Sequence, residues 1–202
     1  MQKTGKLELT WVGKYDEVAV EPRILIEDSS KSYGDPNSEN MLIHGDNLIA
    51  LQALQQDYAG KIKCIYIDPP YNTGSAFEYY EDGLEHSEWL NMMYPRITLL
   101  KNLLSDEGIL CCHIDDSESH YLKCICDEIF GRSNYLTSFY VQVRYPNKTL
   151  AEDSDYQKVV EQVLIYAKDR YKAKVNRPTE EYAIDKFVWR VNEFAEGEEV
   201  LL

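Results

Sequence analysis

The chain has 202 residues, which is enough for about one domain with a real hydrophobic core. It contains no apolar run that could cross a membrane, and Met1–Lys6 is not followed by the apolar stretch of a signal peptide. These features exclude a membrane protein and favour a cytoplasmic one. The net charge of −14 argues against non-specific binding of nucleic acid by the chain as a whole.

The five cysteines agree with a reducing compartment. Their number is odd, and no Cys-x-x-Cys pair occurs. Cys111 and Cys112 are adjacent in an expected strand, so they should point to opposite faces of the sheet. Cys124 and Cys126 lie two apart on an expected helix and should also diverge. We therefore expect reduced cysteines and no zinc or other metal site.

The first third of the chain predicts an arm, a short strand and a helix. Residues 1–40 form the arm, with a short strand indicated at 7–11 by alternation and a polar loop after it. Residues 41–44 predict a second short strand. A helix should then begin after Asp46 and end at Gly60, because apolar residues recur on one face between them. These residues are Leu48, Leu51, Leu54 and Tyr58.

The next strand, residues 62–67, leads into the most informative motif of the chain, Asp68-Pro69-Pro70-Tyr71. The prolines fix φ and carry no N–H, so the strand ladder ends there and carbonyl oxygens remain as free acceptors. In an open α/β sheet, ligands bind just outside the carboxyl ends of the strands. These four residues are therefore candidates for a binding site.

The chemistry of the motif suits a planar base that carries an amino group. If Asp68 accepts one N–H and the Pro69 carbonyl accepts the other, the nitrogen moves toward tetrahedral geometry and can attack an electrophilic methyl group. Tyr71 would stack on the base, which must leave the duplex to be reached. The alternative is a stiff strand-to-helix turn in which Asp68 caps a helix and Tyr71 packs.

The rest of the chain continues the α/β alternation. Apolar residues at steps of 4, 4, 3 and 4 predict a long amphipathic helix from about Ser87, kinked at Pro95. A second helix should follow a cap at Asp115-Asp116-Ser117 and end at Gly131. Three further strands are expected at residues 108–114, 136–144 and 160–168, with a polar segment at 145–157.

Other residues have two possible roles each. Asp115 and Asp116 could face the same cleft as Asp68, although helix capping is the simpler role. His44 and His113 are expected to be strand-end histidines, because attack by an amino nitrogen needs no general base. An aromatic cluster could line a nucleotide path or pack on the long helix. Its members are Phe77, Tyr79 and Tyr80.

Charge is distributed unevenly along the chain. Residues 73–128 carry 12 acids against 3 bases, whereas residues 158–177 carry 6 bases against 2 acids. The second segment is a candidate strip that faces DNA phosphates. An ordinary solvated strand end would have the same composition.

Several segments together resemble the modification subunits of bacterial Type III restriction-modification systems. These subunits are DNA adenine-N6 methyltransferases of the permuted class, in which the catalytic motif precedes the cofactor loop. The resemblance runs in order from about residue 6 to residue 168. It rests on Asn40–Leu48, Asp68–Gly74, Asp82–Ser87 with Trp89, Leu104–Gly108 and Ile114–Asp116.

The resemblance implies a Rossmann-like α/β methyltransferase sheet that uses S-adenosyl-L-methionine. Asp68, Pro69, Pro70 and Tyr71 would be the catalytic residues and would bind a flipped adenine. Asp46, Asn47 and Asp68 would contact the cofactor. The implied partners are double-stranded DNA, a second copy in a homodimer, and a restriction subunit with helicase and endonuclease activity.

The resemblance also implies that parts are missing. A permuted methyltransferase needs a Phe-x-Gly-x-Gly loop after its target-recognition region, and none of the 10 glycines lies two positions from another. We therefore expect an incomplete sheet that is inactive alone, with an arm (1–40), a catalytic subdomain (41–168) and the start of a target-recognition segment (169–202). Alternatives are an RNA or protein-glutamine amino-methyltransferase, or a non-catalytic remnant that binds a partner.

Overall fold

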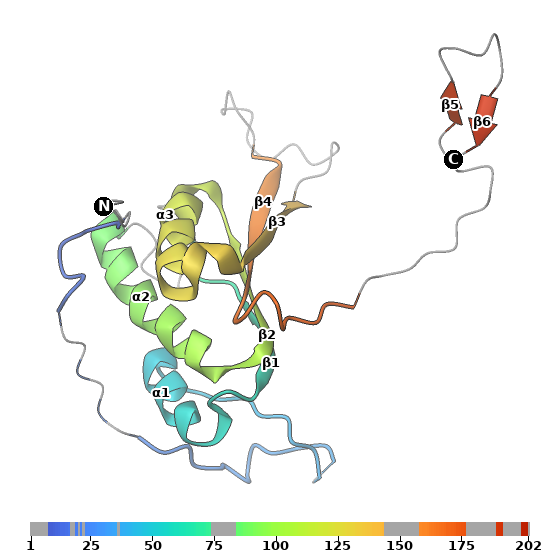
Figure 1. The fold of residues 1–202 in the computed structure, drawn as a ribbon. Helices are drawn as coiled ribbons and strands as arrows, with labels where there is room; N and C mark the ends of the chain where they lie inside the picture. Colours follow the sequence, from blue (N-terminus) through green and yellow to red (C-terminus); the bar gives the residue numbers. More distant parts are fainter. Residues whose placement is uncertain are drawn as a thin grey trace, which may run out of the picture.

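The computed structural model describes residues 8–16, 19, 21, 23–35, 37–73, 84–143, 158–176, 189–191 and 199–201. A four-stranded sheet with the order β1-β2-β4-β3 forms its centre (Figure 1). The chain runs through α1 (Asn47–Tyr58), β1 (Ile62–Ile67), α2 (His86–Leu103), β2 (Leu104–Ile114), α3 (Asp116–Cys126), a π-helical turn (Asp127–Gly131), a 3-10 turn (Arg132–Asn134), β3 (Tyr135–Gln142) and β4 (Val160–Ala167). The short strands β5 (Trp189–Val191) and β6 (Glu199–Leu201) pair antiparallel with each other.

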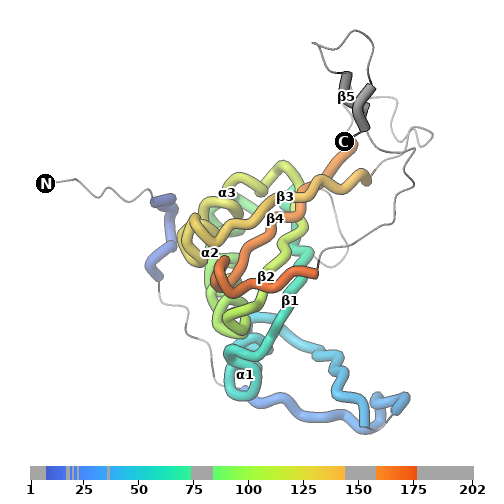
Figure 2. Tube along the Cα trace, turned by 45° about the vertical axis from the view of Figure 1, so that its right-hand side comes forward, coloured from blue at the N-terminus to red at the C-terminus, as the bar shows by residue number. Residues whose placement is uncertain are grey.

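The sheet is mixed. β1 runs parallel to β2, with Ile65 opposite Leu110, whereas β4 runs antiparallel to both β2 and β3. The β1–β2 pairing needs a glycine at position 108, because a Cβ there would lie 2.7 Å from the Ile62 carbonyl oxygen. Within the described residues β1 is an edge strand (Figure 2). The predicted Rossmann-like α/β sheet is thus present with four strands, and β1, which precedes the Asp68 motif, has one open side.

The helices cover one face of this sheet. Leu110, Cys112 and Ile114 alternate along β2 toward the helices and are fully buried. They pack against the apolar faces of α2 and α3, whose innermost residues include Trp89 and Leu122. The predicted divergence of the cysteine pairs is confirmed, since Cys112 and Cys126 are buried while Cys111 is half-buried and Cys124 is exposed.

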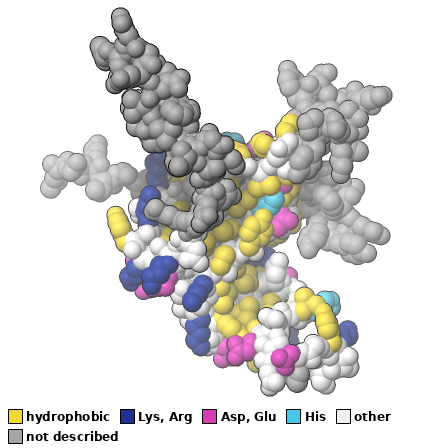
Figure 3. All heavy atoms as spheres, turned by 90° about the vertical axis from the view of Figure 1, so that its right-hand side faces the viewer, with side chains coloured by type: hydrophobic (Ala, Val, Ile, Leu, Met, Phe, Trp, Pro, Cys, Tyr) yellow, Lys and Arg dark blue, Asp and Glu magenta, His cyan; other side chains and the backbone are white. Residues whose placement is uncertain are grey.

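The opposite face of the sheet carries apolar side chains that no described helix covers. By the strand register it comprises Cys64 and Tyr66 of β1, Ile109, Cys111 and His113 of β2, Glu161, Val163 and Ile165 of β4, and Thr137, Phe139 and Val141 of β3. Tyr66 and Phe139 are 59% and 58% exposed. Hydrophobic side chains gather over the sheet when it is viewed from this side (Figure 3). Parallel strands are normally covered on both faces, so this face is suited to being covered.

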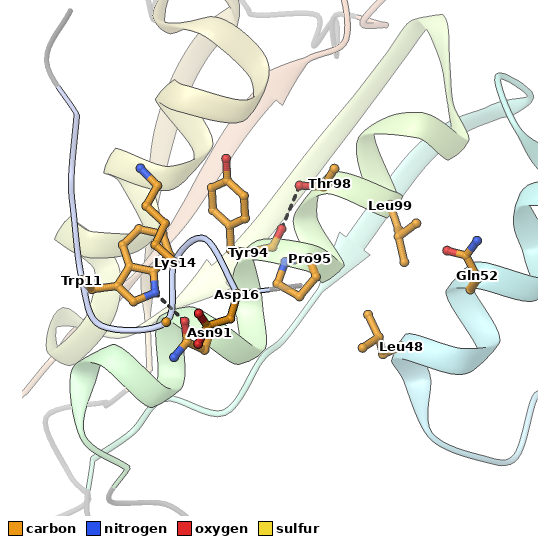
Figure 4. A pocket seen from close by; sticks show the side chains of 11 residues that line it. Trp11, Lys14, Asp16, Leu48, Gln52, Asn91, Tyr94, Pro95, Thr98 and Leu99 are labelled. Atoms are coloured by element: carbon orange, nitrogen blue, oxygen red, sulfur yellow. Dashed lines mark hydrogen bonds between the residues drawn. The ribbon is translucent and has the colours of Figure 1, made fainter. Parts of the chain in front are cut away.

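The N-terminal residues 8–16 pack on α2. The Trp11 indole donates to Asn91 Oδ1 at 2.6 Å, and the Lys14 amine lies 2.9 Å from carboxylate oxygens of both Glu8 and Glu128. A cleft of about 490 Å³ lies between this segment, α1 and α2 (Figure 4). None of the predicted site residues lines this cleft, so it results from the docking of the segment on α2 and not from the motif at Asp68.

Two sequence predictions about strands are wrong. Residues 41–44 and residues 8–11 are not strands. Met41 and Leu42 are exposed, and a strand forms only where a neighbouring strand supplies hydrogen-bond partners. The long helix continues through Pro95, and β2 begins four residues earlier than predicted. No helix in the described part of the chain is long and apolar enough to span a membrane.

Candidate active site at the end of strand β1

The turn after β1 is held from behind by α2. The indole N–H of Trp89, which is fully buried, donates to the Pro70 carbonyl at 2.8 Å. The Pro69 carbonyl takes part in none of the hydrogen bonds found among the described residues. Of the two proline carbonyls, Pro70 is therefore engaged by the protein and Pro69 remains available. The predicted acceptor pair, Asp68 and the Pro69 carbonyl, is compatible with this geometry.

Tyr71 is half-buried and fixed at its hydroxyl group, which donates to Glu161 Oε2 at 3.1 Å. Burial, together with the nearby carboxylates of Asp68 and Glu161, raises the pKa of Tyr71 far above its usual value. The phenol is therefore neutral at all physiological pH values. The centroid of its ring lies 6.1 Å from the centroid of the His113 ring. The Lys158 amine nitrogen lies 5.5 Å from the same Tyr71 centroid.

Ionisable groups at or next to the ends of β2 and β4 lie around Tyr71. Lys158 forms an ion pair with Asp115 and lies 3.4 Å from Glu161 Oε1. His113 Nε2 is 2.9 Å from Glu161 Oε2, although that nitrogen lacks an aligned hydrogen bond. The buried Asp115 also caps α3 by accepting from the Ser117 amide. Burial opposes ionisation of Asp115, but hydrogen bonds from Lys158 and Ser117 outweigh it and lower its pKa.

Asn72 follows Tyr71 in the left-handed region, with φ of 59°. Its amide donates to the Leu84 carbonyl at 2.9 Å and to Glu118 Oε1 at 2.5 Å. The same Glu118 oxygen lies 2.7 Å from His86 Nδ1 at the start of α2. Glu118 has no exposed surface, and its second oxygen has no hydrogen-bond partner among the described residues.

Two of the three predicted cofactor residues, Asp46 and Asn47, lie at the start of α1, and the third, Asp68, follows β1. Asp46 caps this helix by accepting from the Leu48 and Ile49 amides, so the structural role proposed for a capping aspartate is present. Asn47 Oδ1 accepts from Arg96 Nε at 2.7 Å, and burial lowers the pKa of Arg96. The second Asp46 oxygen has only a 3.9 Å contact with Arg96, and the side chain is 56% exposed. One carboxylate oxygen of Asp46 therefore remains available to a ligand.

Helix α2 relates the two groups of predicted residues. Trp89 contacts the turn after β1 and Arg96 contacts Asn47. Seven residues of α-helix rise by about 10 Å and make almost two full turns, so both contacts lie on one side of α2. The start of α1 and the turn after β1 therefore both contact α2, about two helical turns apart along its axis.

The basic strip is largely neutralised. Lys172 lies 2.7 Å from Asp106 and Lys174 lies 2.6 Å from Glu107, while Lys158 is paired with Asp115. These contacts favour the alternative of an ordinary strand end, and a DNA-facing role stays a prediction. Arg177 of this strip and the aromatic cluster, Phe77, Tyr79 and Tyr80, lie outside the described residues.

Sequence reasoning missed three parts of this site. Trp89 was predicted as part of a helix face, but its hydrogen bond to Pro70 was not. Glu118 and Glu161 looked like two acids among many in an acidic chain. Their burial distinguishes them from the other acids, because Glu118 is completely buried and Glu161 is largely buried. The alternation of Glu161 with Val163 and Ile165 along a strand was a weak signal that Glu161 is buried.

Comparison with known proteins shows what the chain is similar to. Residues 62–197 match a protein-family model described as a DNA methylase, N6_N4_Mtase. The chain is 37% identical over 158 residues to a probable Type III restriction-modification enzyme HindVI Mod subunit of Haemophilus influenzae, with 78% of this chain and 21% of that one covered. It is 36% identical over 191 residues to the StyLTI Mod subunit of Salmonella typhimurium, with 80% and 29% covered.

The chain therefore spans less than a third of the length of these relatives. Among solved structures, the M1.HpyAVI–SAM complex matches with 18% identity and a TM-score of 0.45, covering 70% of this chain and 60% of that one. The resemblance to Type III modification subunits inferred from the motifs is confirmed by the sequence matches. The family match covers most of the chain, including the Asp68 motif, and the chain belongs to the DNA methylase family N6_N4_Mtase.

Proposed function

We propose that this chain carries the catalytic turn of a DNA adenine-N6 methyltransferase that acts in restriction-modification and uses S-adenosyl-L-methionine. The observation that carries the proposal is the arrangement at the end of β1. The Pro70 carbonyl is engaged by Trp89, whereas the Pro69 carbonyl beside Asp68 is not engaged by any described residue. The similarity to Mod subunits supports DNA as the substrate.

The chain's own residues would orient the target amino group. Asp68 accepts one N–H and the Pro69 carbonyl accepts the other, so the nitrogen lone pair is turned away from the ring and toward the methyl donor. Tyr71 offers its ring to a base that has left the duplex, and its bond to Glu161 restrains the position of that ring. S-adenosyl-L-methionine, when bound, supplies an electrophilic methyl group.

The described residues fit one side of a cofactor site. The second carboxylate oxygen of Asp46, which has only a 3.9 Å contact with Arg96, can accept from a hydroxyl or amino group at the positive end of the α1 dipole. Asp68, at the end of β1, would be the second residue that holds the cofactor. The open edge of β1 leaves room for further chain on the second side.

The test is methyl transfer by the full-length gene product. We expect N6-methyladenine in duplex DNA, and a loss of at least about 10²-fold in turnover for Asp68→Ala, because the lost acceptor acts mainly on the transition state. The control is Asp57→Ala, which removes an exposed acid from α1. Undiminished turnover by Asp68→Ala would rule out the assignment.

The same assay separates the alternatives. RNA and a glutamine-containing peptide, offered in place of duplex DNA, present an amino group of similar chemistry. Methylation of either one in preference to DNA would replace the proposed substrate while keeping the catalytic turn. No methylation of any substrate would favour a non-catalytic partner-binding role. Assembly with a second copy and with a restriction subunit, proposed from the relatives, is measured by co-purification.

A further inference from the structure

We infer that Glu118 is a positioning residue for the catalytic turn and acts through Asn72. This inference rests on the proposed function, because it assigns a role in the same reaction. Glu118 comes from α3, whereas the turn it holds follows β1, so the two meet only in the folded chain. The carboxylate also contacts His86 of α2 and therefore ties three elements to one another.

The burial of Glu118 demands a reason. A buried carboxylate is costly unless donors surround it, and Glu118 has no exposed surface. Both of its described donors, Asn72 Nδ2 and His86 Nδ1, share one oxygen, while the other oxygen has no partner among the described residues. An apolar residue would fill the same space at lower cost to stability. The presence of a carboxylate at position 118 is better explained by its contact with Asn72 than by a contribution to the stability of the fold.

What it holds is a strained residue next to Tyr71. Asn72 is the one non-glycine residue with positive φ in the described part of the chain, and this conformation costs about 1–2 kcal/mol. Such strain persists where surrounding contacts over-determine it. Here the two bonds of the Asn72 amide, to Leu84 and Glu118, do so. The backbone conformation of Asn72 helps to set the position of the neighbouring Tyr71.

The turn after β1 is therefore held at two residues, Pro70 and Asn72. Trp89 engages the Pro70 carbonyl on one side of Tyr71, and Glu118 engages Asn72 on the other. Loss of the Glu118 contact should free Tyr71 and the Pro69 carbonyl to move by a fraction of an ångström. A misplacement of about 1 Å can reduce turnover about 10²-fold, so a smaller one should reduce it by less while ligands still bind.

The experiment measures kcat and KM of the full-length gene product with DNA and S-adenosyl-L-methionine. Glu118→Ala and Asn72→Gly should each lower kcat about 10- to 100-fold and leave both KM values nearly unchanged. Glycine suits the backbone at position 72, so this variant removes the side-chain bonds without adding strain. Glu118→Gln keeps an acceptor oxygen for Asn72 and should restore most of the turnover.

A double variant tests the route. If Glu118 acts through Asn72, Glu118→Ala with Asn72→Gly should be no slower than the slower single variant. Fully additive losses would overturn the inference, as would wild-type kcat in both single variants or a Gln variant as slow as the Ala variant. Glu88→Ala, an exposed acid on α2, is the matched control.

Two further controls keep the outcomes distinct. Thermal melts show whether each variant folds, and if Glu118→Ala does not, Asn72→Gly and Glu118→Gln carry the test. Loss of turnover by Asp68→Ala, together with unchanged turnover by the Glu118 and Asn72 variants, would overturn this inference alone. Wild-type protein that methylates nothing would instead overturn the proposed function.

Discussion

At the scale of single residues, Tyr71 combines two roles that substitution can separate. In the proposed function its ring stacks on a flipped base, while its hydroxyl group donates a hydrogen bond to Glu161. Tyr71→Phe should therefore keep much of the methyl-transfer activity, and Tyr71→Ala should lose it, with base binding weaker by roughly 1–3 kcal/mol. Binding of duplex DNA with a mismatched target base measures this loss. Equal activities for the two variants would count against stacking.

The Asp115–Lys158 pair predicts a dependence of stability on pH. Because the folded-state pKa of Asp115 is lowered from 3.8, folding favours its ionised form. The stability from this group is present above pH 3.8 and is lost as pH falls through the lower, folded-state value. Lys158→Met should raise the Asp115 pKa and reduce stability at neutral pH.

Carboxyl NMR titration and acid-unfolding curves of wild type and Lys158→Met check this prediction. The control is Lys31→Met, which removes an exposed lysine from a turn distant in sequence from the site. An Asp115 pKa that does not rise in Lys158→Met would show that the Ser117 cap alone lowers it.

At the scale of elements, local patterns predicted what local forces decide. The steps of apolar residues predicted α2 with its buried face, and the cap at Asp115 predicted the start of α3. The predicted end at Gly131 was five residues too late for α3, because a π-helical turn follows Cys126. Residues 41–44 were predicted wrongly, because a strand depends on a neighbour that the pattern does not contain. The motif at Asp68 is continuous in the sequence and could be recognised there. Glu118 and Glu161 reach it from α3 and β4, so their contacts with the motif could not be predicted.

The open edge of β1 predicts self-association of the chain when it is studied alone. No strand of the described residues pairs with the outer edge of β1, and this edge, with the exposed Tyr66 of the same strand, forms a template for another strand. Tyr66→Lys should reduce association, because a charge on an exposed edge strand opposes pairing. Sedimentation velocity over a range of concentrations measures it, with Tyr33→Lys, in an exposed loop, as control. A monomeric wild-type chain at all concentrations would contradict the prediction.

At the scale of the whole molecule, the proposed function assigns to the described residues one side of a cofactor site. We predict that the 202-residue chain alone binds S-adenosyl-L-methionine weakly or not at all and does not methylate DNA. A nucleotide-like cofactor needs close backbone approach at a glycine loop, and the described groups are limited to the start of α1 and the end of β1.

Calorimetric titration of the chain with the cofactor tests this expectation. Micromolar one-to-one binding, together with methylation of adenine-containing duplex, would show that the cofactor site lies elsewhere in the chain. A fusion to the C-terminal part of a Mod subunit should restore both binding and turnover.

The spacing of contacts along α2 has a consequence for sequence variation. From one side of α2, Trp89 contacts the turn after β1 and Arg96 contacts the start of α1. Inserting or deleting one residue between them would rotate one contact by about 100° relative to the other and break the alignment. Active homologues should therefore keep the distance between these two positions constant. Selection thus acts on the number of residues between Trp89 and Arg96 in α2, and not only on the catalytic motif.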